Sequence, residues 1–139
     1  MSNRDIVTTA FDDWAAGRGH VSRIFAPDMT WEIVGRSAAA GRYSSERQFA
    51  DEVLTPFGRR FGTDDPFRPV AIRGLYVDDA ADSVIVLWDG GGTTVADTVY
   101  ENTYAWVMRL DDGLVVDATA FFDSIAFDEL WNAVAPRDE

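Results

Sequence analysis

Three polar side chains in one stretch of the chain could hold the oxygen of a small molecule. Tyr100, Asn102 and Tyr104 are spaced two apart, so in a β-strand they share one face with Trp106. An amide and two phenols can donate hydrogen bonds to a carbonyl or hydroxyl oxygen beside an aromatic wall. Asn and Tyr within a strand also often bond only to neighbouring backbone, so ligand contact by these four residues is one of two open interpretations.

One carboxylate, Asp123, follows the last predicted strand and directly precedes a predicted helix. Burial beside Phe121 and Phe122 would suit a catalytic acid or base that moves a proton on the substrate. As the residue just before a helix, the same side chain would accept hydrogen bonds from backbone amides and serve as an N-cap. We therefore carry two hypotheses for Asp123, catalysis and capping.

Composition excludes several classes of function. The 139 residues carry a formal charge of −12, with 24 acidic and 12 scattered basic side chains, which argues against a nucleic-acid partner. There is no cysteine, and His20 is the single histidine, so we expect no cofactor and no metal. The chain shows no signal-peptide pattern at its start and no apolar run near the ~20 residues of a membrane span, which predicts a cytoplasmic protein without a membrane partner.

The first half of the chain is predicted to be mainly helical. Apolar spacing predicts a helix from Ser2 to Gly17, a short helix over 21–25 and a longer helix over 45–62 that is kinked at Pro56. Between them we expect a strand over 29–34 and a loop over 35–43. Aromatic residues at these spacings are usually core, but four of them could also line a ligand pocket: Trp14, Trp31, Phe57 and Phe61.

From Phe67 onward the apolar period changes to two, which predicts strands. We expect them over 68–77, 83–88 and 98–110, and then up to Asp123, with turns at 78–82, 89–92 and 111–113. A final amphipathic helix begins at Ser124 and ends before Pro136. Helices followed by a run of strands indicate one α+β domain over residues 1–139.

Four segments in this order resemble the nuclear transport factor 2-like, or SnoaL-like, superfamily, which includes ketosteroid isomerases, limonene epoxide hydrolases and polyketide cyclases. They are Phe25–Ile33, Gly41–Tyr43, Tyr100–Tyr104 and Asp112–Val116 leading to Phe121–Asp123. The resemblance implies a cone-shaped, strongly curved mixed or antiparallel sheet, with N-terminal helices packed on its concave face and a short C-terminal helix. It also implies a pocket for a small, mostly apolar molecule, to which Tyr43 and Phe122 would contribute.

Catalytic residues of these relatives are only partly present. The general base of the isomerases corresponds to Ile33 here, and their second acid falls near Trp106. The Arg and Asp of the epoxide hydrolases have no counterpart, because the matching strand reads Trp88-Asp89-Gly90. The closing aspartate of the cyclases matches Asp123, without their histidine partner.

These observations predict a SnoaL-like small-molecule-binding domain, with two hypotheses for its function. The first is a cofactor-free acid/base isomerase, cyclase or hydrolase acting through Asp123 on an apolar, oxygen-bearing substrate. The second is a non-catalytic ligand-binding or dimeric interaction module, in which Asp123 is a helix cap. In both we expect a homodimer through the opposite sheet face, which carries Thr103, Ala105 and Val107 with parts of 84–88.

Overall fold

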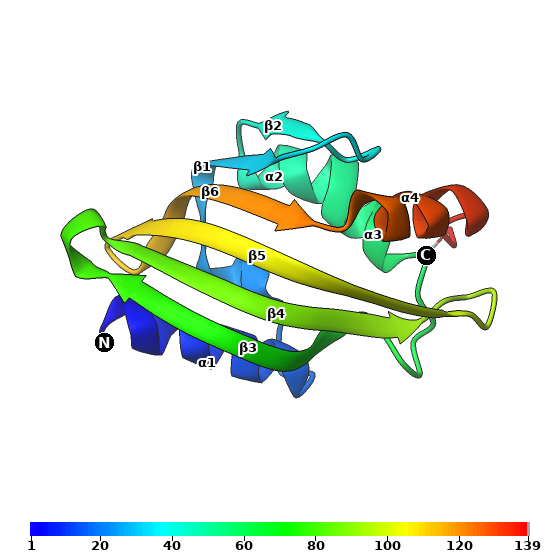
Figure 1. Cartoon of the computed structure of the whole chain (residues 1–139), viewed down its shortest axis with the longest axis horizontal. Helices are drawn as coiled ribbons and strands as arrows, with labels where there is room; N and C mark the ends of the chain where they lie inside the picture. The colour runs from blue at the N-terminus through cyan, green and yellow to red at the C-terminus, as the bar shows by residue number, and fades with distance from the viewer. Residues whose placement is uncertain (139) are drawn as a thin grey trace.

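One curved β-sheet with helices packed against it forms the protein (Figure 1). The computed structural model describes residues 1–138. In chain order its elements are α1 (Asn3–Ala15), η1 (Val21–Ile24), β1 (Phe25–Ile33), β2 (Gly41–Tyr43), α2 (Glu46–Phe49), η2 (Ala50–Leu54), α3 (Thr55–Gly58), β3 (Arg68–Asp78), η3 (Asp79–Ala81), β4 (Ser83–Thr93), β5 (Val99–Asp111), β6 (Leu114–Phe122) and α4 (Ser124–Ala133). Within this part of the chain, no helix has the length and apolarity needed to cross a membrane.

The six strands pair in the order β2-β1-β6-β5-β4-β3. All neighbours are antiparallel except β1 and β6, which run parallel. The last strand of the chain therefore lies in the middle of the sheet, between β1 and β5 (Figure 1). The sheet stays open, with β2 and β3 at its edges, and the predicted α+β class with a curved mixed sheet is confirmed.

The two faces of the sheet differ in burial because successive side chains of a strand point to opposite sides. On β4, Val84, Val86 and Trp88 are fully buried, whereas Ile85 and Leu87 between them are half-buried. The same alternation runs along β5, where every second residue from Tyr100 to Leu110 is buried. The buried face carries large aromatic rings, and it is the face on which the helices pack.

Helix α1 forms where its spacing predicts. The hydroxyl of Ser2 accepts a hydrogen bond from the amide of Asp5 and caps its start, and Gly17 follows its end at a φ of 76°. Phe11 and Trp14 face the sheet, and the Phe11 ring lies 5.4 Å from that of Trp88. Helix α1 thus packs its aromatic side chains against the aromatic side chains of the sheet.

The helix predicted over 45–62 is shorter than expected and changes its winding. The amide of Thr55 donates to the carbonyl of Ala50, five residues back, so the segment Ala50–Leu54 is a π-helix. Pro56 follows directly, and its ring cannot pack against a normally wound preceding turn. The predicted kink thus takes the form of one widened turn before α3.

The turn predicted at 89–92 is wrong. β4 continues through Gly90, Gly91 and Gly92 to Thr93, and the hairpin turn lies at 94–98. A Cβ at Gly90 would lie 2.5 Å from the ring of Phe67, and one at Gly92 would lie 2.9 Å from the backbone of Pro66. These glycines serve close packing of the 66–67 segment rather than a turn.

Two boundaries near the start of the chain also differ from the predictions. β1 begins at Phe25 instead of 29, although Pro27 lies within it, because Phe25 already pairs with Val115 of β6. The segment expected to be a loop over 35–43 ends in the short edge strand β2, where Tyr43 pairs with Trp31. Both extra pairings depend on β1 having a neighbour on each side.

Candidate functional site

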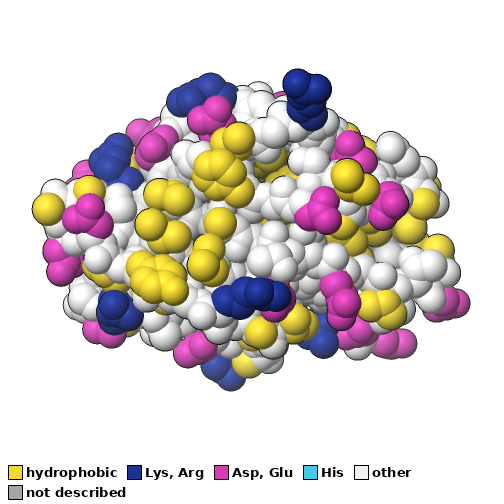
Figure 2. Space-filling view, in the orientation of Figure 1, with side chains coloured by type: hydrophobic (Ala, Val, Ile, Leu, Met, Phe, Trp, Pro, Cys, Tyr) yellow, Lys and Arg dark blue, Asp and Glu magenta, His cyan; other side chains and the backbone are white. Residues whose placement is uncertain are grey.

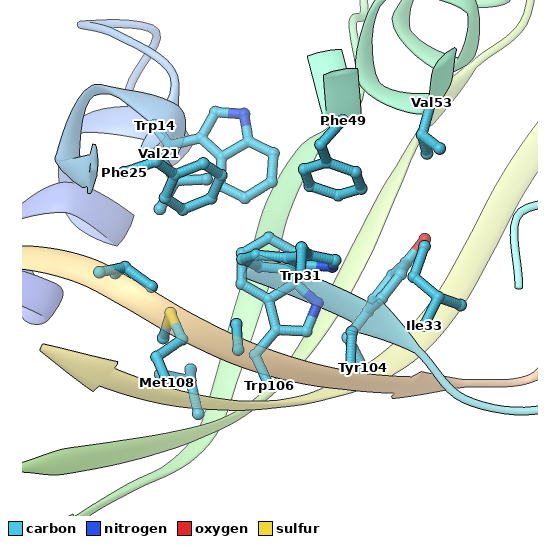
Figure 3. Close-up of a cluster of buried hydrophobic side chains, with 14 of the residues drawn as sticks. Trp14, Val21, Phe25, Trp31, Ile33, Phe49, Val53, Tyr104, Trp106 and Met108 are labelled. Carbon is cyan, nitrogen blue, oxygen red and sulfur yellow. The ribbon is translucent and has the colours of Figure 1, made fainter. Parts of the chain in front are cut away.

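Three strands supply an aromatic floor on the buried face of the sheet. Trp31 comes from β1, Trp88 from β4, and Tyr104 and Trp106 from β5. The Trp31 and Trp106 rings meet edge to face at 4.8 Å, and Trp88 stacks on Tyr104 at 4.4 Å. Figure 3 shows Trp31, Trp106 and Tyr104 side by side beneath Phe49 and Val53.

Space remains above this floor because β6 contributes alanines between the tryptophans of its neighbouring strands. β6 lies between β1 and β5, and its inward residues Ala118 and Ala120 pair with Trp31 and Trp106, respectively. An alanine beside a tryptophan leaves the volume of a larger side chain unfilled. Of the two alanines, Ala120 lines the cavity, and its small side chain helps to leave this space open.

Helical segments cover part of this space from the other side and leave a partly open cavity of about 160 Å³. Trp14 of α1 lines it, and so do Phe57 and Phe127, which stack on each other at 5.6 Å. None of the lining residues carries an acidic, lysine or arginine side chain. The cavity is thus aromatic and apolar, with a few N–H and O–H groups.

Six of the predicted ligand-binding residues line this cavity and four do not. Those that line it are Trp14, Trp31, Phe57, Tyr104, Trp106 and Phe122. The other four, Tyr43, Phe61, Tyr100 and Asn102, are buried nearby without reaching it. Tyr43 donates its hydroxyl hydrogen bond to the carbonyl of Ala39, and Tyr100 is covered by the rings of Phe57 and Phe61 at 5.7 and 5.9 Å.

A chain of hydrogen bonds links Asn102 to the cavity wall. The Asn102 amide nitrogen donates to the Tyr100 hydroxyl at 2.7 Å, and the Tyr100 and Tyr104 hydroxyls are 2.9 Å apart. Burial raises the pKa of Tyr104 well above its usual value, and it also raises the pKa of Tyr100. Both phenols therefore keep their protons, and the hydrogen-bond chain reaches Tyr104, which lines the cavity.

Asp123 lies outside the cavity, at the start of α4. Its carboxylate is exposed and accepts hydrogen bonds from the amides of Ile125 at 2.9 Å and Ala126 at 3.3 Å. Its backbone is held by Asn102, whose side chain bonds to both the N–H and the C=O of Asp123. The capping role is thus visible in the geometry, and the catalytic role stays a prediction.

Asp123 and Asn102 instead border a polar cleft on the outer side of the sheet, together with Arg73, Asp89 and Thr103. Arg73 and Asp89 form an ion pair at 2.9 Å, and Asp89 also accepts from the Thr103 hydroxyl at 2.7 Å. The Thr103 hydrogen bond, followed by the Arg73 pair, lowers the pKa of Asp89. Among the described residues, no group of three or more His, Cys, Asp and Glu side chains is placed to hold a metal.

Eleven of the 17 residues that line the cavity are absent from the sequence-based prediction of the pocket, among them Trp88, His20 and Phe67. His20 caps η1, because its Nδ1 accepts from the amide of Ser22 at 3.0 Å, and its ring lies 4.7 Å from that of Trp14. Phe67 lies over the glycines of β4 and edge-on to Phe57 at 4.8 Å. The glycine triplet was the available signal for Phe67, since small residues in a strand indicate close packing from above.

The molecule is an α+β domain with an apolar cavity between its sheet and its helices, and solved structures share its fold. An NTF2-like protein from Burkholderia thailandensis has a TM-score of 0.69 at 21% identity, over 94% of this chain and 97% of its own. A protein described as a SnoaL-like polyketide cyclase from Jannaschia has a TM-score of 0.69 at 18% identity, over 94% and 92% of the two chains. TerC, co-crystallised with polyporic acid, has a TM-score of 0.67 at 16% identity, over 94% and 98%.

The chain therefore has the NTF2-like fold, and the fold predicted from the resemblance is confirmed. No family model matches the sequence, and no curated protein matches it. Identities of 16 to 21% establish the fold, so function is argued from the side chains of this cavity.

Proposed function

We propose that this chain binds one small, mostly apolar molecule in the cavity between its sheet and its helices. The observation that carries this proposal is an aromatic cavity of about 160 Å³ without a charged side chain in its wall. An apolar cavity of about this size can hold one benzene-sized molecule. Binding of a single ring or a compact bicyclic compound matches both its size and its chemistry.

The energetic cost of the cavity supports a functional role. Protein interiors are close-packed, and unfilled volume costs about 24 cal/mol per Å³. A hollow of this size then lowers stability by up to about 4 kcal/mol, a large part of the ~5–15 kcal/mol that holds a domain folded. A bound molecule would restore the missing contacts.

Access from solvent is expected beside His20. A shallower surface hollow shares Trp14, His20, Pro66 and Phe67 with the cavity. Pro66 and Phe67 belong to the segment between α3 and β3, which regular secondary structure does not fix. A ligand that enters beside this segment would not disturb the sheet.

The acid/base role predicted for Asp123 is not part of this proposal. Its exposed carboxylate is used by the amides of α4 and does not line the cavity. A molecule in the cavity would meet the Tyr104 hydroxyl instead. These contacts favour the ligand-binding hypothesis over isomerase, cyclase or hydrolase chemistry at Asp123.

Filling the cavity tests the proposal. Ala120 lines it, whereas Thr119, the next residue of β6, points to the outer face. Toluene should raise the thermal unfolding midpoint of the unaltered protein and of Thr119→Leu, and this shift should vanish in Ala120→Leu. The proposal is overturned if toluene has no effect on the unaltered protein, or if its effect survives in a folded Ala120→Leu variant.

A further inference from the structure

Two indole N–H groups of the cavity floor lack a hydrogen-bond acceptor. The Nε1 atoms of Trp31 and Trp88 are buried and find no partner among the described residues. Trp31 is 1% exposed and Trp88 is 0% exposed, so water outside the protein does not reach them. Each buried donor without an acceptor costs about 1–3 kcal/mol of stability. Such groups are rare in folded proteins, so two of them in one cavity wall need an explanation.

Both residues that carry these unpaired N–H groups belong to the cavity wall. Both residues line it, and both flank Trp106, which they contact at 4.8 and 5.0 Å. Figure 3 shows the indole nitrogen of Trp31 on the side of the ring that faces Ile33 and Tyr104, which line the cavity as well. A ligand oxygen at this position would accept a hydrogen bond from the Trp31 N–H, which has no acceptor among the described residues.

Tyr104 offers a third donor at the same wall. The Asn102 amide donates to the Tyr100 oxygen, and the Tyr100 and Tyr104 hydroxyls share one hydrogen bond in which either can be the donor. When Tyr100 donates, the proton of Tyr104 is free for an acceptor in the cavity. A ligand oxygen beside Tyr104 would favour this direction.

A wall that offers donors without charges selects among possible ligands. No arginine or lysine lines the cavity, so a buried carboxylate would lack a counter-charge, and no acidic residue is present for an amine. Water is also a poor match, because both of its protons would need acceptors. A carbonyl oxygen has two lone pairs and no proton.

We propose that the bound molecule is an uncharged one-ring compound, and that its carbonyl oxygen accepts hydrogen bonds from the indoles of Trp31 or Trp88 and from the Tyr104 hydroxyl. This inference rests on the binding function proposed above and narrows it to a class of ligand. The rest of the molecule is held by the aromatic rings of the floor and of the helices. Ring stacking fixes its plane, and the donors fix the position of its oxygen.

A matched pair of ligands separates this inference from simple apolar binding. Acetophenone carries the carbonyl, and 2-phenylpropene has the same shape with a CH₂ group in place of the oxygen. We expect acetophenone to bind about tenfold more tightly, which corresponds to one net hydrogen bond of about 1.4 kcal/mol. Benzoate should bind more weakly than either.

The indole N–H resonances of ¹⁵N-labelled protein report the contact directly. On addition of acetophenone, the signal of Trp31 or Trp88 should move to the frequency of a hydrogen-bonded indole, and 2-phenylpropene should not cause this shift. Trp131 is an internal control, because it packs on Arg60 at 3.8 Å and does not line the cavity. This measurement needs no variant.

Removing the donors one at a time completes the test. Trp31→Phe and Trp88→Phe keep an aromatic ring but lose the N–H, so the preference for acetophenone should fall while 2-phenylpropene still binds. Trp131→Phe should retain the preference.

Equal affinity for the two ligands, with unmoved indole signals, overturns the inference and leaves the binding function intact. Tighter binding of benzoate overturns the inference as well. If neither toluene nor acetophenone binds, the binding function itself fails.

Discussion

His20 provides a clean readout at the scale of one residue, because it is the single histidine of the chain. Burial lowers its pKa to about 4, compared with about 6.5 for an unperturbed histidine. Although part of its side chain is exposed, its Nδ1 accepts from the Ser22 amide, which a protonated ring cannot do. A proton on His20 would break the cap of η1.

We predict that His20 titrates near pH 4 in the folded protein, as followed by the NMR signals of its ring. Between the folded and unfolded pKa values the unfolded chain binds more protons, so this group lowers stability as the pH falls from about 6.5 to 4. The variant His20→Asn should have a flatter dependence of the urea midpoint over this range. Titration between pH 6 and 7 would contradict the prediction.

We predict that the carboxylate of Asp123 stabilises the fold by capping α4. Asp123→Ala removes the acceptor for the amides of Ile125 and Ala126 and should lower the free energy of unfolding by about 0.5–2 kcal/mol. Asp123→Asn keeps an oxygen acceptor and should cost less. Urea unfolding measures both, and acetophenone affinity should be unchanged in each. Loss of affinity at unchanged stability would instead favour a functional carboxylate.

Among the elements, β4 carries the sharpest packing constraint. Gly90→Ala would place a methyl group 2.5 Å from the ring of Phe67 and 2.7 Å from that of Trp88. We predict that this variant loses about 1–3 kcal/mol of stability in urea unfolding. Gly58→Ala is the control, because a Cβ added there would meet open space, and it should be neutral or stabilising. Equal stability of the two variants would refute the packing argument.

Sequence patterns predicted the elements whose causes are local. The cap and apolar spacing of α1 and the alternation along β5 depend on residues that are close in the chain, so both could be found without the fold. The glycine run of β4 was misread as a turn, because glycine tolerates a turn and also permits close packing. Only the distant residue Phe67 distinguishes the two causes.

For the candidate site, the sequence likewise predicted what depends on neighbours in the chain and missed what depends on distant residues. Alternation placed Tyr100, Asn102, Tyr104 and Trp106 on one face, and they do share it. It could not show where along the strand the cavity ends, since that is set by the rings that cover Tyr100 from α3 and beyond. The unpartnered indoles were equally invisible, because hydrogen-bond partners are a property of the folded chain.

For the whole molecule, the outer face of the sheet is the main surface to explain. Apolar side chains on this face pair across β4, β5 and β6. Ile85 lies beside Val107, and Leu87 lies beside Ala105, which in turn lies beside Phe121. Figure 2 shows yellow apolar side chains gathered toward the end of the sheet where β3 and β4 join. Such a surface is typical of a contact between protein subunits.

We predict a homodimer through this face, measurable by light scattering or sedimentation at micromolar concentration. Val107→Glu places a charge between Ile85 and Thr119 and should shift the protein to monomer. Val95→Glu, in the exposed hairpin turn, should leave the dimer intact. A monomeric unaltered protein, or a dimer that survives Val107→Glu, would rule out this interface.

The parallel pairing of β1 with β6 joins segments 87 residues apart, as between Thr30 and Asp117. Closing so long a loop is entropically costly and slows folding, typically to milliseconds or longer. Until β6 joins the sheet, Trp31 and Trp106 lack the strand that lies between β1 and β5. The floor of the cavity is thus completed only when β6 docks, and a ligand can assist folding only after that step.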